Sequence, residues 1–255
     1  MNPLETFVKS DSVVRKIWSD SDNILFIFGA CAGEFAQSKS VDWLFFTGKL
    51  PKDPIGRLFS TVVYAQQIIF EEKRKAERTL DNMKNIHKNV ENERGYAIPN
   101  WAYQDVLYML IAYTISAYEL LNQTLSTDEK NEIFDVFRRV GLKMGIENLP
   151  TNFAHWEVHR QENLQLNYAN SILTNQLFDA YRTHLGNFRF SILLSVQDML
   201  LPKELKNAIG GYRIPNLIGM TKLYKYTKHI CPINQLKFYL LPVQYRKMLR
   251  NLHRN

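Results

Sequence analysis

The stretch KRKAERTLDNMKNIHKNV, residues 73–90, decides the fold class of this chain. Leu80, Met83, His87 and Val90 follow one another at steps of three and four residues, which is the spacing of one face of an α-helix. Most of the other positions are charged or carry amides. The stretch therefore predicts a helix with one narrow apolar face, and it places His87 on that face and away from the charged side.

A histidine on the apolar face of a helix has two common explanations. Either the ring is a core histidine that hydrogen-bonds to a carbonyl, or a free ring nitrogen coordinates a metal. The helix around His87 favours the first explanation by itself, because core histidines are the commoner case. Metal coordination is the hypothesis that the rest of the chain has to support.

The remaining sequence predicts more helices, and it contains no β-hairpin signal, alternating strand or repeat. The sequence therefore predicts an all-α fold: a multi-helix, bundle-like domain that encloses an apolar pocket. The other predicted helices cover residues 13–18, 24–37, 55–70, 101–122, 126–145, a segment from 149 onward, 164–184, 188–200 and short basic helices in the C-terminal tail.

Local signals mark where several helices begin and end. Asp53 is a helix N-cap followed by Pro54 at the first helical position. Ser126 and Glu129 have the spacing of a capping box, and Gly145 is placed to end that helix. Residues 21–23, Ser-Asp-Asn, are expected to cap the helix 24–37.

Two helices contain residues that suggest a ligand or a close neighbour. The helix 24–37 contains Gly29 and Gly33, which permit something flat or bulky to approach its backbone, or simply close helix packing. The helix 55–70 carries Arg57 and Thr61 one turn apart on an otherwise apolar helix, so both call for a polar partner. A bound carboxylate, the polar edge of a cofactor or an ion pair between helices would each supply one.

Length and composition bound the class of protein. With 255 residues, 45% of them hydrophobic and 13% aromatic, the chain can bury a large core, and we expect one helical domain over residues 1–255. Residues 1–22 would be an N-terminal arm, and residues 201–255 a basic helical tail packed on the domain. Cys31 and Cys231 have no disulfide or metal spacing, and no secretion signal or bilayer-length apolar run is present. We therefore expect a cytoplasmic protein.

The positive charge of the chain belongs to its C-terminal tail. From Leu201 onward the sequence contains 11 of the 32 lysines and arginines but one of the 25 acidic residues, Glu204. Basic and aromatic residues alternate in this tail, as in the segment 222–228. A solvated helix face is the simplest explanation, peripheral contact with an anionic membrane is the functional one, and we expect no nucleic-acid partner.

The order of these motifs resembles the oxygenase family of the fungal MpaB protein and the bacterial rubber oxygenases. Residues 53–61, DPIGRLFST, are similar to the family segment "dPlgRL..T", and residues 83–90, MKNIHKNV, to its "R..H..V" segment. Residues 115–119, 137–145 and 149–150 are similar to its "s.l..ye", "(w/f)r.vg..lG" and "lP" run. The tail matches the closing pattern of the family at residues 201–202, 210, 241–242 and 246.

The resemblance implies a helical domain that encloses a haem-sized apolar pocket, binds haem b and oxidises an apolar, isoprenoid or otherwise unsaturated substrate with O₂. It implies that His87 is the axial ligand of the haem iron. It also implies that Arg57 and Thr61 lie near the haem as cofactor-binding and catalytic residues, and that Lys84 assists in binding the cofactor. The chain departs from the family pattern at several positions. Ala30-Cys31 stands where many relatives have His-Pro, residues 105–107 stand where they have Trp-Val-His, and Lys84 and Glu91 replace two arginines.

Two alternatives belong to other classes of protein. The chain could be a haem-free or catalytically inactive helical protein that binds an apolar ligand. It could also be a metalloprotein that uses His155 and His159, which have the one-turn spacing of helical metal sites, with Glu157 or Glu162 as a further ligand. That pair lacks a clearly placed third ligand, and surface and packing histidines are the favoured explanation.

Overall fold

The computed structural model of the chain describes residues 5–206, 210–214, 219, 221, 224–225, 227 and 241–246. This part of the chain contains helices and two isolated β-bridges but no strand, so the predicted all-α fold class is confirmed. The helices are α1 (Val13–Ser19), α2 (Ser21–Phe35), α3 (Val41–Phe46), α4 (Lys49–Lys52), α5 (Pro54–Phe70), α6 (Lys73–Arg94), α7 (Asn100–Leu121), α8 (Thr127–Met144), α9 (Phe153–Asn167), α10 (Ile172–Leu200) and α11 (Lys203–Lys206).

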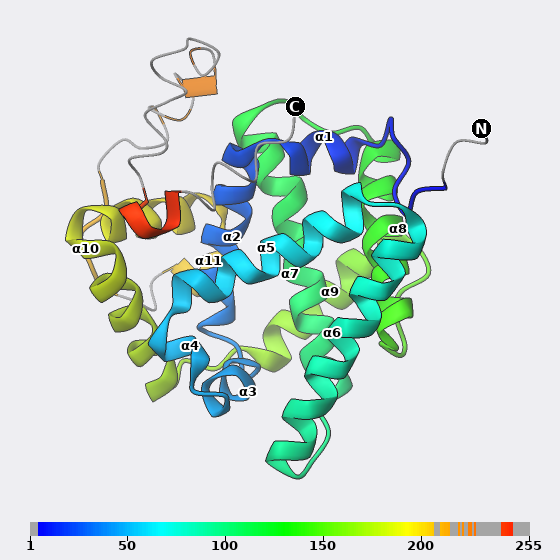
Figure 1. Ribbon diagram of the computed structural model, residues 1–255. Helices are drawn as coiled ribbons and strands as arrows, with labels where there is room; N and C mark the ends of the chain where they lie inside the picture. Colours follow the sequence, from blue (N-terminus) through cyan, green and yellow to red (C-terminus); the bar gives the residue numbers. More distant parts are fainter. Residues whose placement is uncertain are drawn as a thin grey trace.

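The long apolar helix α7 lies in the middle of the bundle and packs along α2. Figure 1 shows α5 crossing in front of these two helices, with α10 on one side and α8 on the other. Large side chains of α7, among them Tyr108, Ile111 and Tyr113, are almost completely buried. A helix that is apolar around most of its girth has to be covered on every side, which explains its central position.

The predicted helix caps are confirmed where they depend on residues that are close together in the sequence. Asp53 accepts a hydrogen bond from the Gly56 backbone N–H at 2.9 Å, and Pro54 opens α5. The Ser126 hydroxyl accepts from the Glu129 N–H at 3.2 Å, while the Glu129 carboxylate accepts from the Ser126 N–H at 2.8 Å. Gly145 ends α8 with a positive φ of 81°, a backbone conformation that glycine adopts without steric cost.

The start of α2 differs from the prediction. Asp20 and not the segment 21–23 provides the cap, because its carboxylate accepts from the Asp22 N–H at 2.9 Å. Ser21 and Asn23 already lie inside the helix and are buried. The prediction placed the cap too late because three consecutive residues that favour caps follow Asp20.

The helices α9 and α10 also divide at a different point. The predicted helix 164–184 was wrong, since Leu164 belongs to α9 and the chain leaves the helix after Asn167. There the backbone pairs with the segment after α2: the Ala169 N–H donates to the Gln37 carbonyl at 2.7 Å. The predicted break before residue 188 is a kink in α10, where Gly186 has a φ of 74° and a ψ of 162°.

The far end of α6 is fixed by one arginine. The Arg94 guanidinium pairs with Asp42 and lies over the Trp43 ring, with 4.2 Å from its central carbon to the ring centroid. It also lies 4.9 Å from the centroid of the Tyr96 ring. This contact ties the end of α6 to α3, and it therefore limits the movement of the helix that carries His87.

The described residues at the ends of the chain contact the helical body. The Lys73 N–H donates to the Glu5 carbonyl at 2.9 Å. In the tail, the Tyr224 hydroxyl donates to Asp22 at 2.7 Å and the Tyr245 hydroxyl to Asp53 at 2.6 Å. Most of the basic tail, Cys231 included, lies outside the described residues. Within the described residues, no helix combines the length and the apolar character needed to cross a membrane.

Candidate functional site

The hairpin of α5 and α6 brings three of the predicted site residues together. Arg57 and Thr61 lie one turn apart on α5, where the Arg57 Nη1 donates to the Thr61 hydroxyl at 2.9 Å. The same hydroxyl is 3.3 Å from the Arg57 carbonyl and donates to it. His87 on α6 is close enough for the Arg57 charge to act on its ring. The prediction that Arg57 and Thr61 share a face is confirmed.

The His87 ring is half-buried and packs against α7. Its centroid lies 5.2 Å from that of the Tyr103 ring, and the two planes meet at 62°, which is an edge contact. The Nδ1 atom is buried and has no hydrogen-bond partner in the described part of the chain. A core histidine would normally have a carbonyl or hydroxyl at this nitrogen, so the first explanation of this residue does not hold for Nδ1.

The surroundings of His87 favour its neutral form. Burial lowers the pKa of His87 and the Arg57 charge lowers it further, while Glu91 opposes both effects. A neutral imidazole is the form that coordinates metals. Burial also lowers the pKa of Arg57, and among the described residues no carboxylate pairs with its guanidinium.

Glu91, at a position where the resemblance led us to expect an arginine, closes the turn between α6 and α7. Its carboxylate accepts from the Ile98 N–H at 2.9 Å and from the Tyr103 hydroxyl at 3.4 Å, and it lies 3.4 Å from the Lys88 ammonium. Glu91 therefore orients the aromatic ring that packs against His87. Lys84, the remaining predicted cofactor residue, lies exposed on α6.

Two groups in this site match the chemistry of a haem. The buried Nδ1 of His87 lacks a partner, and the half-buried Arg57 lacks an anion. Haem provides an iron that an imidazole coordinates and two propionates that a guanidinium binds. The residues that are present therefore fit this group, with His87 on the iron and Arg57 on a propionate.

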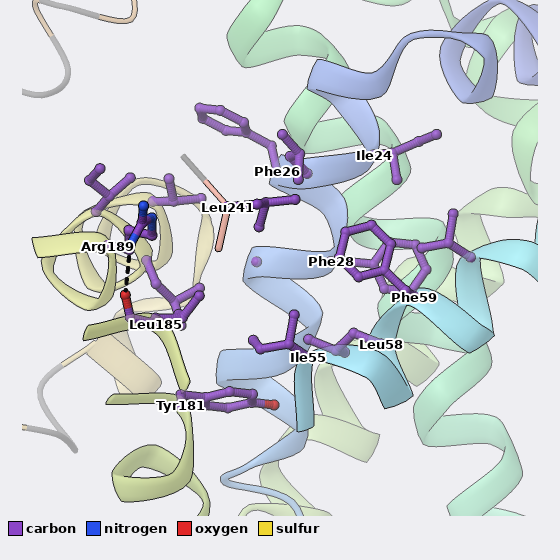
Figure 2. Close-up of a pocket in the computed structure, with 16 residues that line it drawn as sticks. Ile24, Phe26, Phe28, Ile55, Leu58, Phe59, Tyr181, Leu185, Arg189 and Leu241 are labelled. Atoms are coloured by element: carbon purple, nitrogen blue, oxygen red, sulfur yellow. Dashed lines mark hydrogen bonds between the residues drawn. The ribbon is translucent and has the colours of Figure 1, made fainter. Parts of the chain in front are cut away.

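A cavity of about 140 Å³ lies on another face of α5, between α2, α5 and α10 (Figure 2). Ile55, Leu58 and Phe59 contribute to its lining, whereas Arg57, Thr61, Lys84 and His87 do not. A porphyrin is much larger than this volume. The cavity and the His87 site are therefore two separate features on two faces of one helix.

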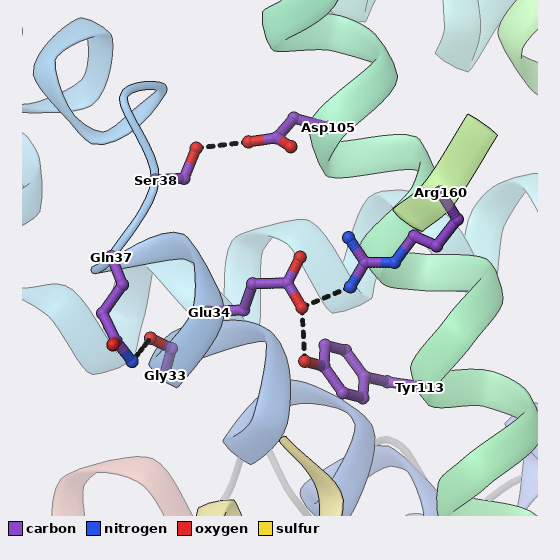
Figure 3. A network of polar contacts seen from close by, with 7 residues as sticks. All are labelled: Gly33, Glu34, Gln37, Ser38, Asp105, Tyr113 and Arg160. Atoms are coloured by element: carbon purple, nitrogen blue, oxygen red, sulfur yellow. Dashed lines mark hydrogen bonds and ion pairs between the residues drawn. The ribbon is translucent and has the colours of Figure 1, made fainter. Parts of the chain in front are cut away.

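Sequence reasoning missed a buried polar network between α2, α7 and α9. The Glu34 carboxylate accepts hydrogen bonds from the Arg160 guanidinium and the Tyr113 hydroxyl (Figure 3). The Glu34 and Arg160 side chains are only 2% and 7% exposed. Nearby, Asp105 accepts from Ser38 and from Ser40, the latter at 3.0 Å, and burial raises its pKa. The sequence did hold one signal of this network: Glu34 is the only charged residue within the largely apolar stretch 24–37.

The alternative metal site has no support in the described residues. His155, Glu157, His159 and Glu162 are all exposed on α9. No group of three histidine, cysteine or acidic side chains in the described ranges is arranged to hold a metal ion. Cys31 is buried, and burial raises the pKa of its thiol, as expected for a small apolar core residue.

Comparison with known proteins places these features in a family. The family model described as ER-bound oxygenase mpaB/B′/Rubber oxygenase, catalytic domain, matches residues 18–181, which is more than half of the chain. The matched range contains α2 to α9, both faces of α5 and the His87 site. No curated protein and no solved structure matches the chain.

Proposed function

Because this chain belongs to the family of the ER-bound oxygenase MpaB and the rubber oxygenases, we propose that it is a haem-dependent oxygenase. The cofactor is haem b, the oxidant is O₂, and the substrate is an apolar molecule with an electron-rich double bond or ring, for which an isoprenoid is the family precedent. His87 would hold the haem iron.

The observation that carries the proposal is the buried Nδ1 of His87, which has no hydrogen-bond partner in the described chain. A buried nitrogen without a partner costs about 1–3 kcal/mol, so its environment is incomplete unless something binds there. The neighbouring Arg57 also lacks an anion, and its charge adds to the effect of burial in lowering the pKa of His87. A metal complex that carries carboxylates satisfies both residues at once.

Each residue of the site has a role that its position supports. His87 offers a neutral nitrogen for coordination. Arg57 binds an anionic edge of the cofactor, and Thr61 holds the Arg57 side chain through the hydrogen bond of 2.9 Å. Tyr103, oriented by Glu91, packs against the His87 ring and restricts its rotation. Haem, when bound, supplies the redox-active iron needed for O₂ chemistry.

Titration of the purified full chain with haemin tests the proposal. We expect one haem per chain and a Soret band in the wild type, and no specific binding by His87→Ala. His155→Ala is the matched control, because His155 is an exposed histidine on α9 and should not change binding. Unchanged haem binding by His87→Ala would show that this histidine is not the ligand.

The role of Arg57 has its own test. Arg57→Met should weaken haem affinity by about tenfold to a hundredfold, the usual value of a hydrogen bond to a charged group. Arg57→Lys keeps the charge without the forked geometry and should recover part of the loss. Equal affinity of Arg57→Met and wild type would remove Arg57 from the cofactor site.

We also propose that the basic tail brings the protein to an anionic membrane surface, where an apolar substrate would be found. From residue 201 onward one acidic residue accompanies 11 basic ones. Co-sedimentation with anionic and with neutral vesicles tests this contact. Equal recovery with both kinds of vesicle would contradict it.

A further inference from the structure

The walls of the cavity between α2, α5 and α10 are almost wholly apolar (Figure 2). Its volume of about 140 Å³ is close to the volume of about 150 Å³ of an engineered apolar cavity that binds benzene. Arg189 is the charged residue in the described lining, and its Nη1 donates to the Leu185 carbonyl at 3.4 Å. The apolar part of the lining includes Ile24, Phe28, Leu58, Val62, Leu193 and Val196.

The lining also contains a buried tyrosine. Tyr181 on α10 is only 1% exposed, and among the described residues no hydrogen bond of its hydroxyl is seen. Figure 2 shows this hydroxyl directed from α10 toward α2 and α5. By contrast, Tyr113 and Tyr245 both donate to carboxylates. A ligand atom in the cavity can therefore form a hydrogen bond with the Tyr181 hydroxyl.

Gly29 keeps part of the cavity open. A Cβ atom at this position would lie 3.4 Å from the Val196 Cγ1 and 3.6 Å from the Leu193 Cδ1, which is ordinary van der Waals contact. Four residues later, a Cβ atom at Gly33 would lie only 2.6 Å from the Gln197 side chain. Close packing of α2 on α10 therefore explains Gly33, but it does not require a glycine at position 29.

We propose that this cavity binds a small uncharged molecule, with an apolar body about the size of one six-membered ring and a single oxygen that hydrogen-bonds to Tyr181. The described lining is almost wholly apolar and holds one charged side chain, Arg189, so it favours an uncharged ligand over a charged one, whose hydration it replaces poorly. The site does not involve His87 and does not depend on haem binding.

Phenol and toluene are suitable probes, because they have nearly the same shape and differ in one hydroxyl group. Isothermal titration calorimetry of the full chain should detect binding of both. Tyr181→Phe removes one oxygen atom for which no partner is seen among the described residues, so the fold should be unaffected. We expect this variant to bind phenol about fivefold to tenfold more weakly, the net value of one hydrogen bond, and to bind toluene as before.

Gly29→Ala tests the cavity itself. The added methyl group occupies ligand space, so binding of both probes should weaken, whereas the melting temperature should rise because alanine stabilises a helix interior relative to glycine. Asn82→Ala is the control, since Asn82 is exposed on α6 and remote from the cavity lining. It should also raise the melting temperature, but it should leave both affinities unchanged.

Three results would overturn the proposal: no binding of either probe to the wild type, an equal effect of Tyr181→Phe on phenol and toluene, or unchanged binding in Gly29→Ala. Failure of haemin to bind at His87 would not affect the measured binding of phenol and toluene. The two proposals can therefore be refuted separately.

Discussion

The ion pair between Glu34 and Arg160 should be the most sensitive point of the fold. Both side chains are almost fully buried, and Tyr113 shares the same carboxylate oxygen. Arg160→Leu would leave the Glu34 carboxylate in the core without its cation, and breaking a buried pair in this way costs about 3–5 kcal/mol. At about 2–4 °C for each kcal/mol in a chain of this size, the melting temperature should fall by roughly 6–20 °C.

The triple variant Glu34→Leu, Tyr113→Phe, Arg160→Leu separates charge burial from lost packing. It removes every member of the hydrogen-bonded group, so no charge or hydroxyl of this group is left unpaired. Well-packed apolar residues often replace a buried ion pair at little cost or with a gain, so the triple variant should be more stable than Arg160→Leu alone. Lys75→Leu is the control, because its pair with Glu71 at 3.5 Å is largely exposed.

Urea unfolding followed by far-UV circular dichroism gives the free energy of unfolding of each variant. The control should lie within about 1 kcal/mol of the wild type, the range for exposed pairs. The reasoning would be wrong if Arg160→Leu lost no more than the control, or if the triple variant were less stable than Arg160→Leu.

Three further predictions concern His87 and the helix ends. Arg57→Met should raise the pKa of His87, because it removes the nearby positive charge, and an NMR titration of the ring protons would measure the change; an unchanged pKa would place the guanidinium elsewhere. Because the pKa of folded His87 lies below that of a free histidine, about 6.5, the unfolded chain binds more protons and stability should fall as the pH drops below that value. His87→Gln should remove this part of the pH dependence. If the free energy of unfolding changed with pH as steeply in the variant as in the wild type, this prediction would be refuted. Ser126→Ala should lower the free energy of unfolding by about 1 kcal/mol through loss of the α8 cap, as measured by chemical denaturation. A loss of only a few tenths of a kcal/mol would show that the cap is dispensable.

Local chemistry in the sequence was sufficient to predict several helix ends. Asp53, Ser126 and Gly145 act within a few residues of their own positions, and each has the predicted role. The division of α9 from α10 was not predictable in this way. Pairing of the segment after Asn167 with the segment after α2 determines it, and that contact joins residues more than 120 positions apart.

The same distinction applies to the candidate site. Arg57 and Thr61 are neighbours on one helix, as their spacing predicted. Their grouping with His87 was implied by the family resemblance, and the short connection from α5 to α6 accounts for it. The contact between Tyr103 and His87 depends on how α7 returns beside α6, which no local pattern specifies. Arg160 pairs with Glu34 across 126 positions of the chain, so its partner could not be identified from its own helix.

The most direct test of the haem proposal is the haem content of the full chain expressed with a supply of haem precursor. The pyridine haemochrome assay should give close to one haem b per chain for the wild type and almost none for His87→Ala, with both proteins equally folded by circular dichroism. A wild-type chain that is purified without haem and takes up none when haemin is added would contradict the assignment of His87 as an iron ligand.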